Sequence, residues 1–200
     1  MQTTRFETEN ADEIAAFLAH IERNHAGFAA NIGVFDGNSA RIGALEKAGY
    51  ILAEDAEDYR LGRESFVDLA GGICERVTAG NFGGYAAFHD AAFPDIYWNS
   101  MRLNAALANW RVYVARESGK IARACFLTRY KNGFAEIFGL YAPHDTAPFL
   151  AAVIKELYGE FPQTPEIIFF VDAGEEQNKK AAQAVGFIKA RDYKLYAKRL

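Results

Sequence analysis

Residues 110–142 read WRVYVARESGKIARACFLTRYKNGFAEIFGLYA, three apolar stretches separated by Ser118-Gly119 and by Asn132-Gly133. Asn-Gly between two apolar runs is the strongest short-range signal for a β-hairpin, because both central residues of a type I′ turn need positive φ. The segment therefore predicts three consecutive strands joined by hairpins, which is the core of an antiparallel sheet.

The Asn132-Gly133 turn also predicts a register. With these two residues as the loop, Arg129 faces Glu136 and Phe126 faces Gly139. The first pair would be an ordinary cross-strand ion pair. The second pair bears on function, because a glycine inside an apolar strand marks a bulge or the close approach of another group. The alternative is that Phe126 simply covers the gap.

Helix and strand patterns alternate after this segment. TAPFLAAVIKELYGEF (146–161) predicts a helix with Thr146 as its N-cap. EIIFFVDA (166–173) is a continuous apolar run, which is typical of a strand covered on both faces. A last helix ends at Gly186, and FIKARDYKLYAKR (187–199) predicts the closing strands.

The chain before the three strands has a different pattern. FVDLAGGICERVT (66–78) predicts an extended segment. AAFHDAAFPDIYWNSMRLNAALA (86–108) predicts two short helices broken at Pro94, because proline cannot continue a helix interior.

The first 63 residues repeat words of the last third. Gly49-Tyr50-Ile51 and Asp58-Tyr59-Arg60-Leu61 match Gly186-Phe187-Ile188 and Asp192-Tyr193-Lys194-Leu195. In both copies these words follow a helix, a strand and a helix, and we interpret EDAED (54–58) as a turn between two strands. Residues 12–63 are therefore predicted to be a second version of the last third. The alternative is that any such run ending in glycine looks similar.

Composition excludes several classes of partner. The chain has 200 residues, 50% of them hydrophobic, and 22 basic against 26 acidic residues give a net charge of −4. This charge repels phosphate backbones and anionic lipid, so neither nucleic acid nor membrane is expected as a partner. The acidic N-terminal stretch has no secretory pattern, which predicts a cytoplasmic protein. The spacing of Cys74, Cys125 and the four histidines predicts no metal site.

The order of elements over residues 72–200 resembles the GNAT superfamily of acetyl-CoA-dependent N-acyltransferases. That order is a strand, two short helices, three antiparallel strands, a helix, a buried strand, a helix and a final pair. The first 63 residues are similar to the C-terminal half of another such domain, including an asparagine that starts a helix (Asn38) and a Gly-aromatic pair that ends it (Gly49-Tyr50). The resemblance implies an α/β (α+β) fold with a mixed, mostly antiparallel central sheet, splayed central strands and flanking helices. It divides the chain into a partial copy at 1–65 and a complete domain at 66–200.

The resemblance also implies a function, which is transfer of an acyl group from acetyl-CoA to an amine of a small molecule or peptide. By this resemblance the cofactor lies where two central strands part, a backbone N–H stabilises the tetrahedral intermediate, and helix N–H groups hold the phosphates. Cofactor contacts are then expected from Gly139, Leu140, Tyr141, Ala142, His144, Thr146, Ala147 and Asn178.

Catalytic and acceptor roles fall on fewer residues. Glu136 is the candidate general base, since it lies on the strand nearest the thioester in the family geometry. Tyr193 is a candidate for the acid that protonates the departing thiolate. Tyr97 and Trp98 would wall the acceptor site, in the Pro-broken helical loop. Packing is the alternative role for each of these aromatic residues.

Two features depart from the family pattern. The loop PHDTAP (143–148) has no glycine and contains Asp145, whose charge would repel phosphate. At the position of the usual tyrosine acid the two copies have Ala182 and Leu45, which cannot donate a proton. A second hypothesis therefore stays open, namely a GNAT-fold binding or interaction module without turnover. A partial copy without a front sheet of its own also predicts a homodimer.

Overall fold

The computed structural model describes residues 8, 10–94 and 96–200. Its helices are α1 (Ala11–Asn24), α2 (Ser39–Lys47), α3 (Gly83–Ala92), α4 (Ser100–Ala105), α5 (Thr146–Glu160) and α6 (Glu176–Val185), with 3₁₀ turns at Arg63–Ser65 and Leu107–Asn109. Its strands are β1 (Ala29–Phe35), β2 (Ile51–Gly62), β3 (Glu75–Val77), β4 (Trp110–Glu117), β5 (Lys120–Arg129), β6 (Ala135–Tyr141), β7 (Glu166–Asp172) and β8 (Ile188–Arg199).

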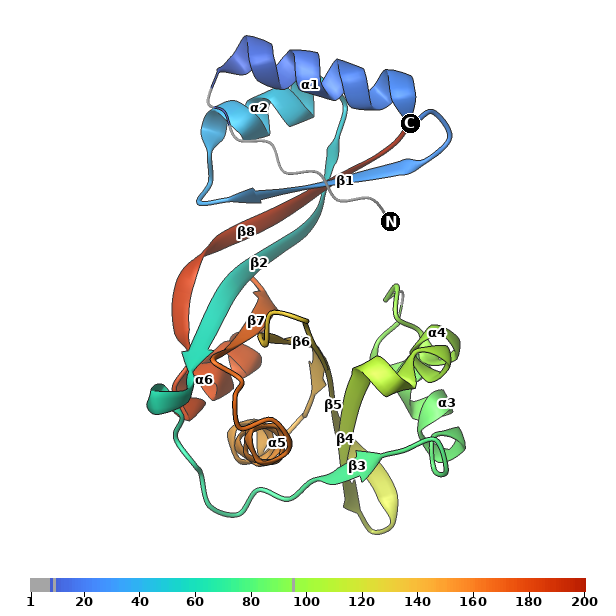
Figure 1. Ribbon diagram of the computed structural model, residues 1–200, viewed down its shortest axis with the longest axis vertical. Helices are drawn as coiled ribbons and strands as arrows, with labels where there is room; N and C mark the ends of the chain where they lie inside the picture. Colours follow the sequence, from blue (N-terminus) through green and yellow to red (C-terminus); the bar gives the residue numbers. More distant parts are fainter. Residues whose placement is uncertain (1–7, 9, 95) are drawn as a thin grey trace. The chain divides into compact units, whose positions relative to one another are not determined.

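The strands form one sheet in the order β1-β8-β2-β7-β6-β5-β4-β3. The pairs β1–β8, β3–β4, β4–β5 and β5–β6 are antiparallel, whereas β6–β7 is parallel. Around β4, β5 and β6, helices α5 and α6 lie on one side and α3 and α4 on the other (Figure 1). The predicted mixed, mostly antiparallel sheet with flanking helices is therefore confirmed.

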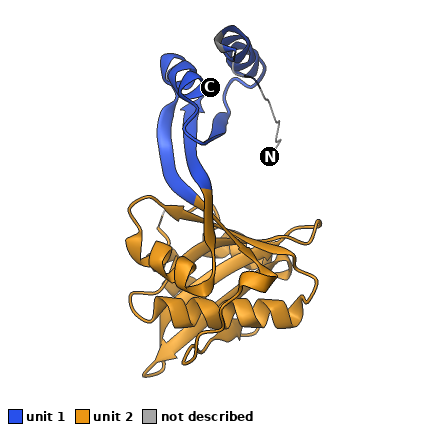
Figure 2. Ribbon diagram, turned by 90° about the vertical axis from the view of Figure 1, so that its left-hand side faces the viewer, with its two compact units in different colours: residues 1–57, 191–200 blue, residues 58–190 orange. Residues whose placement is uncertain are grey.

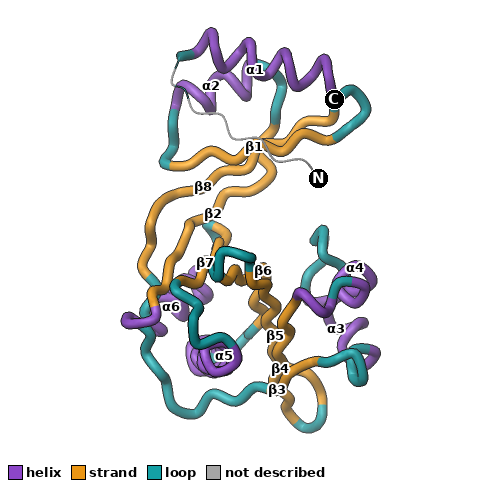
Figure 3. The backbone as a smooth tube through the Cα atoms, in the orientation of Figure 1, coloured by secondary structure: helices purple, strands orange, loops and turns teal. Residues whose placement is uncertain are grey.

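The two repeated phrases each form one long strand. Residues 54–58 were predicted to be a turn, but they belong to β2, which runs unbroken from Ile51 to Gly62, and β8 is equally continuous (Figure 3). The acidic residues are tolerated in a strand because their charges are countered. Asp55 accepts a bond from Lys194 at 2.6 Å, and Asp58 pairs with Arg60.

The chain forms two compact units, residues 1–57 with 191–200, and residues 58–190 (Figure 2). This division differs from the predicted one at residue 65, because the last ten residues of the chain belong with its beginning. The reason is the sheet order, in which β8 lies between β1 and β2. The N-terminal elements thus use a strand of their own chain, which removes the argument that led to the homodimer prediction.

Unit 1 (1–57 and 191–200) has a small core under α1 and α2, formed by Ile14, Leu18, Val34, Leu45, Tyr50 and Tyr196. Helix α1 begins at the N-cap Asn10, whose side chain accepts from the Asp12 and Glu13 N–H groups. Lys198 donates to Glu22 and to the Ala48 carbonyl, which ties the end of β8 to both helices. Its elements α1-β1-α2-β2 have the same order as α5-β7-α6-β8, and the duplication stays a prediction.

Unit 2 (58–190) has a core on each face of its strands. The larger core packs α5 and α6 against β4–β7 and includes the fully buried Leu127, Leu150 and Ile154. The other packs α3 and α4 against β4 and β5 and is rich in aromatic residues, among them Trp110 and Phe126. Within the part of the chain that the structure describes, none of the helices combines the length and apolarity that a membrane crossing requires.

Candidate functional site

The parallel strands β6 and β7 part from one another. They pair at Ala135–Ile167, Glu136–Ile168 and Ile137–Phe169, and the ladder ends there. Strand β6 continues to Tyr141 and β7 to Asp172, and every residue of both strands is described. The predicted splay of the central strands is therefore present, at the carboxyl ends of both strands.

A β-bulge in β6 lies beside this opening. Leu127 of β5 pairs with Ile137 and Phe126 pairs with Gly139, so Phe138 is the extra residue. A Cβ atom on Gly139 would lie 2.3 Å from Phe126 Cε1 and 2.8 Å from Phe93 Cε1. The glycine is thus required by two aromatic rings of the protein's own core, which is the covering role predicted as the alternative for Phe126.

The turn before β6 differs from the predicted one. Tyr130 and Phe134 close a three-residue loop, with Tyr130 N donating to Phe134 O at 2.8 Å. Gly133 has a φ of 93°, whereas Asn132 is absent from the residues with positive φ, so the type I′ turn does not form. Arg129 therefore pairs with Ala135, and the predicted Arg129–Glu136 pair is wrong. The Phe126–Gly139 pair is right, because the bulge at Phe138 restores the register.

Glu136 is consequently free of the arginine that was expected to hold it. Its carboxylate accepts the Tyr130 hydroxyl hydrogen at 2.5 Å. Burial raises the pKa of Glu136 above its usual range, while the Tyr130 hydrogen bond and the Arg60 charge oppose this rise. A carboxylate with a raised pKa is suited to take a proton from an amine near neutral pH.

Arg60 belongs to a partly buried ion cluster whose charges act on Glu136. Its guanidinium binds Asp58, whose side chain is fully buried, and reaches Glu166 at 3.0 Å. The Asp58 charge raises the pKa of Glu136 and the Arg60 charge lowers it. The cluster therefore adjusts the pKa of Glu136 through two charged residues of β2.

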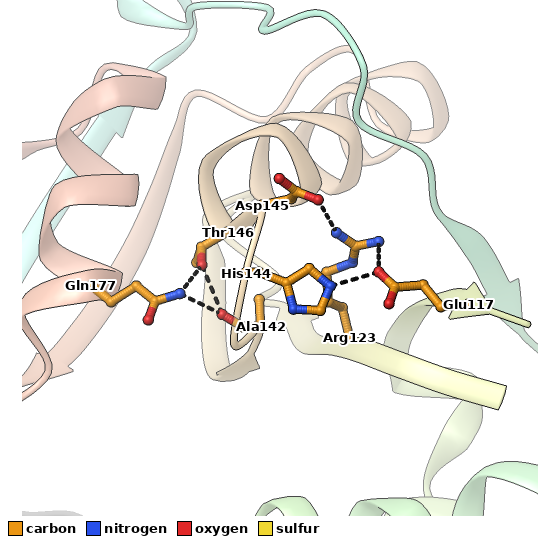
Figure 4. A network of polar contacts seen from close by, with 7 residues as sticks. All are labelled: Glu117, Arg123, Ala142, His144, Asp145, Thr146 and Gln177. Carbon is orange, nitrogen blue, oxygen red and sulfur yellow. Dashed lines mark hydrogen bonds and ion pairs between the residues drawn. The ribbon is translucent and has the colours of Figure 1, made fainter.

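Polar side chains of α6 reach the end of β6. Asn178 donates to the Leu140 carbonyl at 3.3 Å and to Glu175 at 2.7 Å. Gln177 donates to the Ala142 carbonyl at 2.8 Å and to the Thr146 hydroxyl, which itself donates to Ala142 (Figure 4). Two carbonyl oxygens of the predicted cofactor-binding segment thus already accept bonds from the protein.

Helix α5 begins immediately after this segment. Thr146 was predicted as the N-cap, but the cap position belongs to Asp145, which has a left-handed backbone (φ 50°, ψ 33°) and makes no side-chain cap bond. The Asp145 carboxylate turns to Arg123 of β5, at 3.0 Å, and Arg123 also binds Glu117 at 2.7 Å (Figure 4). His144 Nε2 lies 2.7 Å from the same Glu117 oxygen.

Ligand atoms of Glu117, His144 and Asp145 lie within 4.8 Å of one another, a spacing that a metal ion would permit. The Arg123 guanidinium, however, is bonded to both carboxylates and already supplies the positive charge. The arrangement is that of an ion-pair network around an arginine.

The predicted acceptor residues lie in the loop between α3 and α4. Tyr97 is 66% exposed, and the Arg102 guanidinium lies 4.5 Å from its ring centroid. Trp98 is partly buried, with its ring 4.7 Å from that of Trp110, and its carbonyl accepts from His89 Nε2 at 2.7 Å. Tyr97 is thus available to a ligand, whereas Trp98 serves the core.

Tyr193 belongs to unit 1, whereas Glu136 belongs to unit 2. The Tyr193 ring lies 5.1 Å from the Phe35 ring, and a Cβ on Gly33 would lie 2.8 Å from its Cε2 atom. These contacts are packing contacts, which was the role predicted as the alternative, and the catalytic role stays a prediction.

Three residues of the site were not predicted from the sequence, namely Arg123, Tyr130 and Arg60. Arg123 carried a usable signal, because a charged residue in the apolar run ARACFL must have a counterion when the strand is buried. Tyr130 could not be found, since its contact with Glu136 depends on the three-residue loop. Arg60 was missed because its partner Asp58 was assigned to a turn and its other partner, Glu166, lies far away in the sequence.

Solved structures with a similar arrangement are known. A functionally unknown conserved protein from Staphylococcus epidermidis gives a TM-score of 0.65 at 12% identity, covering 98% of this chain and 82% of that one. A GCN5-related N-acetyltransferase from Kribbella flavida gives 0.63 at 12% identity, over 94% and 76%. Another from Sphaerobacter thermophilus gives 0.62 at 16% identity, over 92% of this chain and 63% of that one. No family model and no curated protein sequence matches the chain.

The chain therefore has the GNAT fold, as its element order predicted. At these identities the likeness concerns the fold alone, and function must be inferred from the site.

Proposed function

We propose that this protein is an N-acyltransferase that moves an acyl group from acetyl-CoA, or another acyl-CoA, to an amine of a small molecule or a peptide. The observation that carries the proposal is the parting of β6 from β7 after Ile137, directly followed by the N-terminus of α5. Strand separation exposes backbone groups for an extended ligand arm, and a helix N-terminus attracts phosphate. The GNAT-fold neighbours named as N-acetyltransferases are consistent with this proposal.

The residues present fit such a cofactor through the backbone. Leu140, Tyr141 and Ala142 would line its pantetheine arm, and Gly139 lies at the bulge beside them. When bound, the cofactor supplies an activated acyl group as a thioester.

His144, Thr146 and Ala147 would lie at the phosphates, together with the first N–H groups of α5. Asn178 would support this arrangement through its bond to the Leu140 carbonyl. The charge of Asp145, which the sequence suggested would repel phosphate, is countered by Arg123.

Glu136 would act as the base toward the amine. Its raised pKa and its place on β6 support this role. Tyr97 would contact the acceptor, because its ring is exposed in the α3–α4 loop. Tyr193 receives no role in this proposal, since its ring packs against Gly33 and Phe35.

The test is a thermal melt with and without millimolar acetyl-CoA, followed by thiol release with a panel of amines. At one hundred times its dissociation constant a ligand adds about 2.7 kcal/mol, which raises the melting temperature by several degrees in a chain of this size. Glu136→Gln should keep the thermal shift and lose turnover at least tenfold. A thermal shift with unchanged turnover in Glu136→Gln would remove Glu136 from the mechanism.

A second candidate function is a binding or interaction module without turnover. It is favoured by the bonds of Asn178 and Gln177 to the Leu140 and Ala142 carbonyls, which occupy backbone groups at the opening. The absence of a tyrosine at Ala182 favours it as well. No thermal shift with acetyl-CoA, together with an intact fold, would establish this candidate in place of the enzyme.

We also propose a cytoplasmic location and leave the homodimer as a prediction. Acetyl-CoA as the co-substrate is consistent with a cytoplasmic location. Light scattering of the purified chain measures the second directly, and a mass near 22.2 kDa would contradict a dimer.

A further inference from the structure

Arg123 carries a buried positive charge with incomplete hydrogen bonding. Its side chain is only 9% exposed. Two guanidinium nitrogens bind Glu117 at 2.7 Å and Asp145 at 3.0 Å, while its buried Nε finds no hydrogen-bond partner among the described residues. Because an uncompensated buried charge is costly, an anion must remain at Arg123 at all times.

The anions that now face Arg123 are held loosely. The Asp145 side chain is 68% exposed and the Glu117 side chain is 44% exposed. Both carboxylates are already in contact with water, so each can turn to solvent when another anion takes its place at Arg123. Another anion can therefore replace either carboxylate without a large loss of stability.

The start of α5 adds a second attraction for anions at the same place. The Asp145 side chain does not cap the helix, and its carboxylate points to Arg123 instead (Figure 4). The first helical N–H groups thus donate no bond to the Asp145 carboxylate, and Asp145, the residue that precedes them, contacts Arg123. A guanidinium and a helix N-terminus together are a recurrent combination for phosphate.

We propose that Arg123 binds the diphosphate of the acyl-CoA and that the Asp145 carboxylate occupies its place until this ligand arrives, an inference that rests on the proposed function. This chain lacks a glycine-rich phosphate loop, and an exchange of the Asp145 carboxylate for phosphate at Arg123 takes the place of that loop. The phosphate displaces an exposed side chain rather than entering an open backbone cradle. Asp145 then sets how tightly the site holds phosphate.

The test compares Asp145→Asn with Asp145→Glu by calorimetric titration of CoA and of inorganic pyrophosphate at fixed ionic strength. Asparagine tolerates the left-handed backbone and removes the competing charge, whereas glutamate keeps the charge. Removing one charge at about 4 Å from the ligand in water should strengthen binding of both probes about fivefold. The glutamate variant should stay within about twofold of the natural chain.

Arg123→Lys supplies the second arm. Lysine keeps the charge but loses the forked geometry, so binding of both probes should weaken. In the double variant Asp145→Asn, Arg123→Lys, the gain from asparagine should shrink, because the two residues act on one site. A thermal melt of each variant checks that it is folded.

The outcomes separate the two proposals. If Asp145→Asn binds pyrophosphate more tightly than the natural chain but neither of them binds CoA, the result supports Arg123 as a phosphate site and contradicts the acyltransferase. Binding of CoA that is equal in the natural chain and in Asp145→Asn supports the cofactor and overturns the role of Asp145. A gain for CoA but not for pyrophosphate also overturns it, since the gain would then lie outside the diphosphate. Folded variants that bind neither probe contradict both proposals.

Discussion

Glu136 is partly buried and His89 is fully buried, and their surroundings give these two titratable residues opposite tasks. Glu136 has one hydroxyl donor and an opening beside its strand. The His89 ring is enclosed, with Nε2 donating to the Trp98 carbonyl and Nδ1 accepting from the Tyr85 hydroxyl, each at 2.7 Å. Glu136 is therefore arranged for proton exchange, and His89 for one fixed neutral form.

Tyr130→Phe should raise the pKa of Glu136. The Tyr130 hydroxyl stabilises the ionised carboxylate, and burial would act unopposed by that bond once it is lost. The measurement is the pH titration of the Glu136 carboxyl carbon by NMR, with Glu136→Gln to assign the signal. Tyr141→Phe, on the same strand as Glu136, is the matched control and should leave the titration of Glu136 unchanged. An unchanged titration in Tyr130→Phe would contradict the hydrogen bond.

The chain should lose stability as the pH falls below about 6.5, the pKa of an unfolded histidine, because burial lowers the pKa of folded His89. The unfolded state then takes up the proton first, so the stabilising contribution is present above this pH and is lost below it. Each unit of lowering is worth about 1.4 kcal/mol. The hydrogen bond to the Trp98 carbonyl and the neighbouring Asp90 carboxylate both oppose this lowering of the His89 pKa.

Urea unfolding at pH 7.5 and at pH 5.5 measures this loss. His89→Gln should be less stable at both values and should show a smaller difference between them. The other three histidines are present in both chains, so the difference between chains isolates His89. Equal pH dependence in the two chains would show that His89 does not titrate on unfolding.

At the scale of elements, the bulge in β6 depends on Gly139. Gly139→Ala should destabilise unit 2 by about 1–3 kcal/mol, because a new Cβ would overlap the Phe126 and Phe93 rings. Chemical unfolding measures the change. Gly159→Ala in α5 is the control, since no atom lies within 4 Å of its new Cβ, and it should be neutral or stabilising. A neutral Gly139→Ala would mean that the rings move freely.

The elements around β6 also show what sequence could predict. Three consecutive strands, the buried strand β7 and the flanking helices follow from periodicity and from turn residues, and these predictions are correct. The predicted turn type was wrong, yet the predicted pairing of Phe126 with Gly139 is right. The loop is one residue longer than predicted, and the bulge at Phe138 compensates for the resulting shift in register. The hydrophobic pattern alone cannot distinguish a two-residue turn from a three-residue loop followed by a bulge, because the choice depends on the backbone angle of a single turn residue.

The site was less predictable than the elements. The splay of β6 from β7 came from family resemblance, and the placement of Thr146 and Asn178 beside the end of β6 followed from it. The bonds that decide the chemistry join residues far apart in sequence, such as Arg123 with Asp145 and Arg60 with Glu166. No local pattern encodes such pairs: the charge within an apolar run indicates that Arg123 needs a counterion, but only the structure identifies the partners of Arg123 and Arg60.

At the scale of the whole molecule, unit 1 depends on the last ten residues. A chain that ends at Ala190 should lose protection from hydrogen exchange at residues 29–35, because β1 is an edge strand whose neighbour is β8. Residues 146–160 of α5, within unit 2, should keep theirs. Unchanged protection in β1 would show that another segment replaces β8.

The position of β8 between β1 and β2 has a consequence for synthesis on the ribosome. Ala29 pairs with Arg199, so β1 cannot complete its pairing with β8 until the residues up to Arg199 have been synthesised. During that interval its apolar face and open edge are exposed to chaperones and to other nascent chains. The delay between the synthesis of residues 29–35 and that of residues 193–199 would then set how long β1 stays open to misassembly.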